Sequence, residues 1–147
     1  MKSAMAVDDH PVVRGAVKSV LRHLGYKRIH EAACGNEVLP MIRDNKPELI
    51  VLDLNLPSLD GLDVLARIQI EEMPCKVVVF TAQEPAFFQD RCMRAGAMAY
   101  VAKTNDLEHL QKAVQAVMAG YTYFTRLPTS SVSLSQAQRS EKQMIDR

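Results

Sequence analysis

Residues 49–57 read Leu-Ile-Val-Leu-Asp-Leu-Asn-Leu-Pro, so that four consecutive apolar residues run directly into Asp53. A second apolar run, residues 77–80, reads Val-Val-Val-Phe and ends in the same way at Thr81. Short, continuous apolar runs bounded by turn residues are typical of strands that are buried on both faces of a parallel sheet. These two stretches therefore predict the most buried strands of the fold, each with a polar residue at its carboxyl end.

Helical and strand-like segments alternate on both sides of these runs. The apolar period of residues 11–24 predicts a helix with Pro11 in its first turn and Gly25 just past its end. Pro40 lies inside another helical segment, which it is expected to kink or delay. The remaining elements are predicted strands over 4–7, 28–32 and 98–102 and predicted helices over 35–45, 62–72, 84–95 and 106–119, the last capped by Asn105 or Asp106.

Strands that alternate with helices indicate parallel βαβ units, whose right-handed crossovers place helices on both faces of one sheet. The predicted fold class is therefore α/β, a five-stranded, doubly wound parallel sheet. Ligands in such folds bind at the carboxyl ends of the strands. The residues that follow the predicted strands are Asp8 and Asp9, Asp53, Thr81 and Lys103.

Three carboxylates on one edge of a sheet repel one another unless a cation lies between them. Hard oxygen ligands with open coordination positions suit Mg²⁺. An ammonium from Lys103 and a hydroxyl from Thr81 would complete a cradle for a phosphoryl group. Asp53 follows the central strand and is the predicted nucleophile, since aspartyl phosphates are known covalent intermediates in phosphoryl transfer.

The composition excludes several other classes of protein. The 147 residues suit one domain, and 48% apolar with 24% charged residues is typical of a globular chain. Lys and Arg number 18 against 17 Asp and Glu, which gives no argument for binding nucleic acid. No apolar run is long enough for a membrane span or a secretory signal. The three cysteines match no disulfide or zinc pattern, so a cytoplasmic location is expected.

Several motifs taken together resemble the receiver domain of two-component response regulators. They are Asp-Asp-His-Pro at 8–11, Leu-Asp-Leu-Asn-Leu-Pro at 52–57 with Asp-Gly at 60–61, Thr-Ala at 81–82, Ala-Gly-Ala at 95–97 and Tyr-Val-Ala-Lys at 100–103. The resemblance covers roughly residues 4–120 and implies the flavodoxin-like, CheY-like receiver fold. The first motif and residues 117–124 are similar to the NarL/FixJ subfamily, in particular its virulence-activator (BvgA-like) regulators.

The resemblance implies a role for each residue at the strand ends. Asp53 would accept a phosphoryl group, and Asp8, Asp9 and Asp53 would hold Mg²⁺ together with the backbone carbonyl of Asn55. Lys103 would pair with the phosphate. The chain would take up and lose the phosphoryl group without a separate substrate, so it is not expected to be an enzyme in the usual sense.

A second group of residues would read out the phosphorylated state. Thr81 would move its hydroxyl onto the phosphate and Tyr100 would follow by changing rotamer, so that the surface around 84–95, 98–102 and 106–119 changes. Asn55 and Gln83 lie at positions that tune dephosphorylation in the family, and Gln83 would either orient a water or block one. Thr104 replaces the proline that often follows the lysine of such domains.

Members of this subfamily continue through a linker into a helix-turn-helix domain. Residues 1–122 are therefore predicted to form the receiver, and 123–147 a linker toward a DNA-binding domain that these residues do not include. The implied partners are a sensor histidine kinase or a phosphotransfer protein, and a second copy in a homodimer. DNA would be contacted only through the C-terminal domain, and no membrane is involved.

Three alternatives stay open at this point. A stand-alone receiver would act by protein docking alone. A phosphatase of the haloacid-dehalogenase type would use the same residue types, but it needs an acid where this chain has Asn55. A flavodoxin-like FMN binder would need a first loop rich in Ser, Thr and Gly, whereas Asp8 and Asp9 would repel a phosphate.

Overall fold

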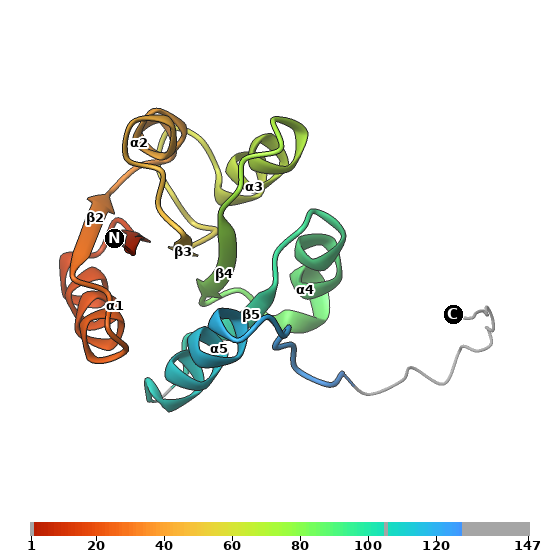
Figure 1. The fold of residues 1–147 in the computed structure, drawn as a ribbon. Coiled ribbons are helices and arrows are strands. Elements are labelled where there is room, and N and C mark those ends of the chain that lie inside the picture. Colours follow the sequence, from red (N-terminus) through yellow and green to blue (C-terminus); the bar gives the residue numbers. More distant parts are fainter. Residues whose placement is uncertain (1, 105, 128–147) are drawn as a thin grey trace.

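Five parallel strands form one sheet in the order β2-β1-β3-β4-β5 (Figure 1). The computed structural model describes residues 2–104 and 106–127. The strands are β1 (Ser3–Val7), β2 (Arg28–Ala32), β3 (Leu49–Leu52), β4 (Lys76–Thr81) and β5 (Ala99–Ala102). The predicted α/β class and the five-stranded parallel sheet are confirmed, and β2 lies at one edge of the sheet.

Helices cover both faces of this sheet, as right-handed crossovers require (Figure 1). They are α1 (Pro11–His23), α2 (Val38–Asn45), α3 (Gly61–Ile70), α4 (Pro85–Arg94) and α5 (Glu108–Met118). The helices α1 and α5 pack on one face, and α2, α3 and α4 pack on the other. The two faces give two hydrophobic cores with the sheet between them.

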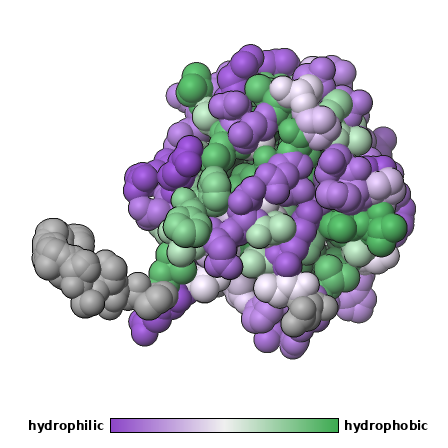
Figure 2. All heavy atoms as spheres, turned by 180° about the vertical axis from the view of Figure 1, so that it is seen from behind, coloured by the Kyte–Doolittle hydropathy of each residue, from purple (hydrophilic) through white to green (hydrophobic). Residues whose placement is uncertain are grey.

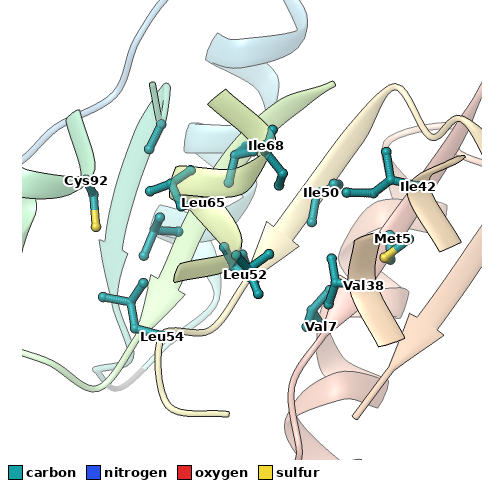
Figure 3. Packing of buried hydrophobic residues seen from close by; sticks show 14 of the residues in the cluster. Met5, Val7, Val38, Ile42, Ile50, Leu52, Leu54, Leu65, Ile68 and Cys92 are labelled. Carbon is teal, nitrogen blue, oxygen red and sulfur yellow. The ribbon is translucent and has the colours of Figure 1, made fainter. Parts of the chain in front are cut away.

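Alternation along the strands divides the apolar side chains between the two cores. Met5 and Val7 of β1 lie in the core beneath α2, whereas Ala4 and Ala6 face α1 and α5. Figure 3 shows Val38 of α2 in the same cluster as the β1 side chains. Both faces of the central strands are buried, which explains why β3 and β4 read as continuous apolar runs.

The segment 35–45 is not one continuous helix. A 3₁₀ turn spans Gly35–Glu37, and the α-helix begins only at Val38. Pro40 therefore lies in the first turn of α2, where its missing N–H would have no intrahelical partner anyway. The expected delay of the helix is observed, and the loss of a hydrogen bond in mid-helix is avoided.

The last helix starts later than the sequence indicates. Helix α5 begins at Glu108, whose N–H donates to the Asp106 carboxylate at 3.1 Å. Asp106 thus supplies the predicted capping oxygen, two residues ahead of the helix. Asn105 and the tail over 128–147 lie outside the described residues.

The strand register brings the polar strand ends to one edge of the sheet. Val7 pairs with Leu52, so Asp8 and Asp53 each follow one member of an aligned pair. Leu52 in turn pairs with Val79, two residues before Thr81. Over residues 2–104 and 106–127, no helix is long and apolar enough to cross a membrane.

Candidate functional site

Two acidic side chains are buried at the carboxyl ends of the central strands. Asp8 directly follows β1 and is 1% exposed, and Asp53 directly follows β3 and is 2% exposed. The Lys103 ammonium joins them, donating to Asp8 Oδ2 at 2.6 Å and to Asp53 Oδ2 at 2.9 Å. Because Lys103 directly follows β5, three strand ends converge on this one cluster of charges.

The charge of Lys103 is maintained by its two partners. Burial alone would lower the pKa of the ammonium, but the hydrogen bonds that it donates to Asp8 and Asp53, together with their negative charges, raise that pKa overall. The ammonium also lies 5.8 Å from the centre of the Phe80 ring, within cation–π range. Lys103 therefore stays protonated at neutral pH and is fixed in direction.

A third acid, Asp9, and a histidine, His10, complete the cluster on its solvent side. Ligand atoms of Asp8, Asp9, His10 and Asp53 all lie within 4.8 Å of one another. The His10 ring nitrogen Nδ1 is 3.2 Å from Asp8 Oδ1 and 3.1 Å from Asp9 Oδ1. The backbone N–H of His10 donates to Asp8 Oδ1 at 2.9 Å, so the Asp8 carboxylate is held by His10 through Oδ1 and by Lys103 through Oδ2.

The donor set of this cluster fits a hard divalent cation. Three carboxylates face one ammonium, so the cluster carries uncompensated negative charge near Asp9. Carboxylate oxygens with solvent access are the ligands that Mg²⁺ prefers. Asp9 is the exposed member and so leaves open positions for water or a phosphate oxygen.

The loops after β3 and β4 are tied together beside Asp53. Gln83 Nε2 donates to Asn55 Oδ1 at 2.7 Å. Asn55 also donates its N–H to Asp53 Oδ1 at 3.2 Å. Thr81 is fully buried, and its hydroxyl oxygen accepts a long 3.4 Å hydrogen bond from the Gln83 N–H. The hydroxyl proton of Thr81 therefore keeps a free direction for a new acceptor.

Tyr100 lies inside the fold and not on its surface. Its side chain is 0% exposed, and its phenol donates to the Gln83 carbonyl at 2.9 Å. Burial raises the pKa of this phenol, and the nearby Cys92, Glu84 and Asp53 add to the effect. Tyr100 is thus linked to the loop that follows Thr81.

Comparison with known proteins identifies this arrangement. The family model described as "Response regulator receiver domain" matches residues 4–115. This chain belongs to that receiver family. The matched residues include all five strands, apart from Ser3 at the start of β1. They also include all the charged residues of the cluster.

Individual relatives narrow the subfamily of this receiver. The Bordetella pertussis regulator BvgA, a "virulence factors putative positive transcription regulator", is 39% identical over 141 residues, which cover 96% of this chain and 68% of BvgA. A LuxR-family response regulator from an Aurantimonas species has a TM-score of 0.76 at 30% identity, covering 91% of this chain and 95% of that one. The receiver is therefore of the NarL/LuxR, BvgA-like type, and its relatives are transcription regulators.

A third relative bears on the metal. The response regulator TrrA from Thermotoga maritima, solved in complex with Mg²⁺ and beryllium fluoride, has a TM-score of 0.69 at 30% identity, covering 78% of this chain and 97% of that one. The acidic cluster of the present receiver is thus of the kind that holds Mg²⁺ in such domains. The FMN-binding and haloacid-dehalogenase alternatives find no support in these matches.

Sequence reasoning missed two contacts of this site. It assigned no contact to His10, whose ring nitrogen lies against Asp8 and Asp9 while 67% of the side chain is exposed. It also did not find Arg14, which donates to the Asp8 carbonyl at 2.8 Å from the first turn of α1. The only sequence signal for His10 and Arg14 is that they follow closely after Asp8 and Asp9. Closeness in sequence does not determine which way a side chain points.

Proposed function

We propose that this receiver accepts a phosphoryl group on Asp53 from a histidine kinase or a phosphotransfer protein. The observation that carries the proposal is the buried Asp53 carboxylate, held at 2.9 Å by the Lys103 ammonium beside two further acids. A carboxylate that is buried at a strand end and paired with an opposite charge is typical of a functional site. Asp8, the other buried acid of the described residues, also pairs with Lys103, but Asp53 is the one that follows the central strand β3.

The transfer requires one Asp53 oxygen as the attacking group. That oxygen forms a bond to phosphorus while the bond from phosphorus to the donor nitrogen, or to the oxygen of a small acyl phosphate, breaks. The Lys103 ammonium neutralises charge on the transferred oxygens, and the Thr81 hydroxyl donates to one of them. The acceptor needs no general base, because the attacking group is a carboxylate, which forms an ion pair with Lys103.

The metal would be held by the side chains of Asp8, Asp9 and Asp53 and the backbone carbonyl of Asn55. When bound, Mg²⁺ neutralises the acids and supplies an electrophile for the phosphoryl oxygens. His10 and Arg14 keep Asp8 oriented from its other side. Asn55 and Gln83 tune the loss of the phosphoryl group, because their hydrogen-bonded amides lie beside the acceptor.

Phosphorylation would be read out through Thr81 and Tyr100. A phosphoryl oxygen attracts the Thr81 hydroxyl, and Gln83 connects that loop to the Tyr100 phenol. The surface formed by α4, β5 and α5 then changes its preferred partner, which we propose to be a second copy in a homodimer. The switch would be a local change in charge that is read by a two-state surface.

Residues 1–122 would serve as the receiver and 123–147 as a linker to a helix-turn-helix domain that controls transcription. Support comes from BvgA, of which this chain covers 68%. A cytoplasmic location is part of the same proposal, because the three cysteines are free thiols. A receiver that acts only by docking to proteins would share the phosphoacceptor and differ in this output.

Intact mass spectrometry after incubation with acetyl phosphate tests the acceptor. We expect one phosphoryl adduct that requires Mg²⁺ and is absent in Asp53→Asn. Asp44→Asn, a substitution of an exposed acid on α2, is the matched control and should behave as the wild type. An adduct that persists in Asp53→Asn, or a wild type that gives none, contradicts the proposal.

A further inference from the structure

Arg14 of α1 joins three elements of the fold next to the acid cluster. Its Nη1 donates to the Asp8 carbonyl at 2.8 Å, and its Nε donates to Glu31 Oε1 on β2 at 2.8 Å. Lys18, one turn further along α1, donates to Glu31 Oε2, also at 2.8 Å. Both oxygens of Glu31 are thus occupied, and this carboxylate anchors the guanidinium beside the end of β1.

Charged side chains on the surface of the molecule are rarely fixed in this way. Figure 2 shows that hydrophilic residues predominate on one face. Exposed ion pairs such as Lys112–Glu108, whose side chains are 56% and 68% exposed, usually contribute little. The Arg14 side chain, by contrast, is only 19% exposed. Its guanidinium is therefore partly removed from water, and the two acceptors replace water as its partners.

The backbone of Asp8 is held on both sides. Its N–H donates to the Ala32 carbonyl of β2 at 3.1 Å, and its carbonyl accepts from Arg14. The Asp8 carbonyl belongs to the planar peptide unit that also contains the backbone nitrogen and the Cα of Asp9. Arg14 therefore fixes the orientation of this peptide plane, and with it the point from which the Asp9 side chain starts.

The Asp9 carboxylate depends on this backbone support more than the other two acids do. Asp8 and Asp53 are buried, and both accept from Lys103. The Asp9 side chain is 37% exposed, and in the described part of the chain its one polar partner is His10 Nδ1, at 3.1 Å. Because the His10 side chain is itself largely exposed, the direction of the Asp9 carboxylate rests mainly on the backbone.

We propose that Arg14 is a positioning residue of the cation site, which holds the Asp8–Asp9 peptide so that the Asp9 carboxylate stays within reach of Asp53. Glu31 is the anchor that acts through Arg14. The inference rests on the proposed function, because the cation is the Mg²⁺ of that proposal. Residues that orient metal ligands without touching the metal commonly change its affinity about tenfold or more when they are replaced.

A purely electrostatic role of Arg14 would have the opposite sign. A guanidinium beside the acids repels a divalent cation, so its removal would strengthen Mg²⁺ binding. A positioning role requires that its removal weakens binding, although a positive charge is lost. Lysine at this position keeps the charge but lacks the planar, two-armed geometry of the guanidinium, so it separates the two roles.

NMR titration of the 147-residue chain with Mg²⁺ measures the dissociation constant directly. We expect Arg14→Gln to weaken binding about tenfold and Arg14→Lys to weaken it by a smaller factor. Glu31→Gln should weaken binding in the wild-type background and add less than about twofold to Arg14→Gln, since it acts through Arg14. Arg22→Gln, which removes an exposed positive charge from the same helix, is the matched control and should bind as the wild type does.

Phosphoryl uptake from acetyl phosphate, followed by intact mass, gives a second measure. In Arg14→Gln the half-saturating Mg²⁺ concentration should rise by the same factor as the dissociation constant. Uptake at saturating Mg²⁺ should stay near the wild-type rate, because Asp53, Lys103 and Thr81 are unchanged. A slower uptake that excess Mg²⁺ does not restore overturns the inference, since it would show damage to the acceptor itself.

Tighter or unchanged Mg²⁺ binding in Arg14→Gln overturns the inference and leaves the proposed function standing. Wild-type affinity in Arg14→Lys also overturns it, because charge alone would then suffice. If Arg14→Gln does not fold, Arg14→Lys and Glu31→Gln carry the test. A wild type that binds no Mg²⁺ contradicts the proposed function itself, and the role of Arg14 falls with it.

Discussion

The side-chain amide of Gln83 donates a 2.7 Å hydrogen bond to Asn55 Oδ1 and so joins the two loops that flank the acceptor Asp53. Both amides follow a strand-end residue by two positions. The contact uses one N–H of Gln83 and one lone pair of Asn55 Oδ1, and it joins both side chains beside Asp53. From this contact we predict that Gln83 blocks an attacking water molecule and does not orient one.

Gln83→Ala should therefore shorten the lifetime of phosphorylated Asp53. Loss of one ordinary hydrogen bond corresponds to about a fivefold faster loss of the phosphoryl group. The decay of the intact-mass adduct after removal of acetyl phosphate measures this rate. Gln115→Ala, a substitution of an exposed glutamine of α5, should decay as the wild type does. A longer lifetime in Gln83→Ala would mean that this amide positions the attacking water.

Lys103→Met should lower the free energy of unfolding at neutral pH without Mg²⁺, because Asp8 and Asp53 lose their common counter-charge. The expected loss is about 3 kcal/mol, as for other broken buried pairs. The raised pKa of Lys103 sets the pH dependence. Its stabilisation is complete below the unfolded pKa of about 10.4 and disappears as the pH rises through the folded value.

Urea unfolding of the wild type and Lys103→Met between pH 7 and pH 11 measures this difference. The difference in free energy of unfolding between the two proteins should stay constant to about pH 10 and shrink above it. Comparison of the pair cancels the ionisation of tyrosines and cysteines. A difference that already shrinks between pH 7 and pH 9 would refute the assignment to the Lys103 ammonium.

Gly61→Ala should disturb the acceptor through its backbone. A Cβ at this position would lie 2.4 Å from the Asp53 carbonyl oxygen and 2.6 Å from Leu54 Cα. We expect destabilisation of about 2 kcal/mol and slower phosphoryl uptake, because α3 and β3 cannot both keep their places. Thermal unfolding and intact-mass kinetics measure the two effects.

Gly15→Ala is the matched control for that substitution. A Cβ at Gly15 meets nothing within 4 Å, and the residue lies inside α1. Alanine should stabilise this helix by about 0.5–1 kcal/mol and leave phosphoryl uptake unchanged. Equal destabilisation by the two substitutions would show that contact with the Asp53 backbone is not the cause.

Two cysteines should react slowly with iodoacetamide at neutral pH. Burial raises the pKa of the Cys75 thiol, and likewise that of the Cys92 thiol, to about 11. Since the thiolate is the nucleophile, their alkylation should accelerate about tenfold per pH unit up to pH 10. Peptide mapping measures each site. In denaturant the rates should level off near the ordinary pKa of about 8.5.

Ionisation of these thiols also opposes folding. Their folded pKa values lie above the unfolded ones, so the associated stability is complete below about pH 8.5 and is lost as the pH rises toward 11. Cys92→Ala should flatten that decline. An unchanged decline in this variant would assign it to other groups, such as the buried Tyr26 phenol, whose pKa burial also raises.

The sequence alone was sufficient for the sheet and for the acids at its edge. Short continuous apolar runs bounded by turn residues are typical of central strands, and parallel strands bring the residues that follow them to one edge. The meeting of Asp8, Asp53 and Lys103 therefore follows from the order of the predicted strands and from the apolar pattern of each. No long-range contact has to be known. The sequence does not determine where α2 starts, because a proline in a helical pattern is compatible both with a kinked helix and with a helix that starts later.

Only the tertiary structure decided which side chains meet across the loops. The contacts Gln83–Asn55 and Gln89–Thr125 join residues 28 and 36 positions apart. No periodicity encodes them, since each depends on how a loop leaves a strand and where a helix places its amide. The docking of Tyr123 on β5 has the same origin, because an edge strand accepts any extended segment that the fold brings to it.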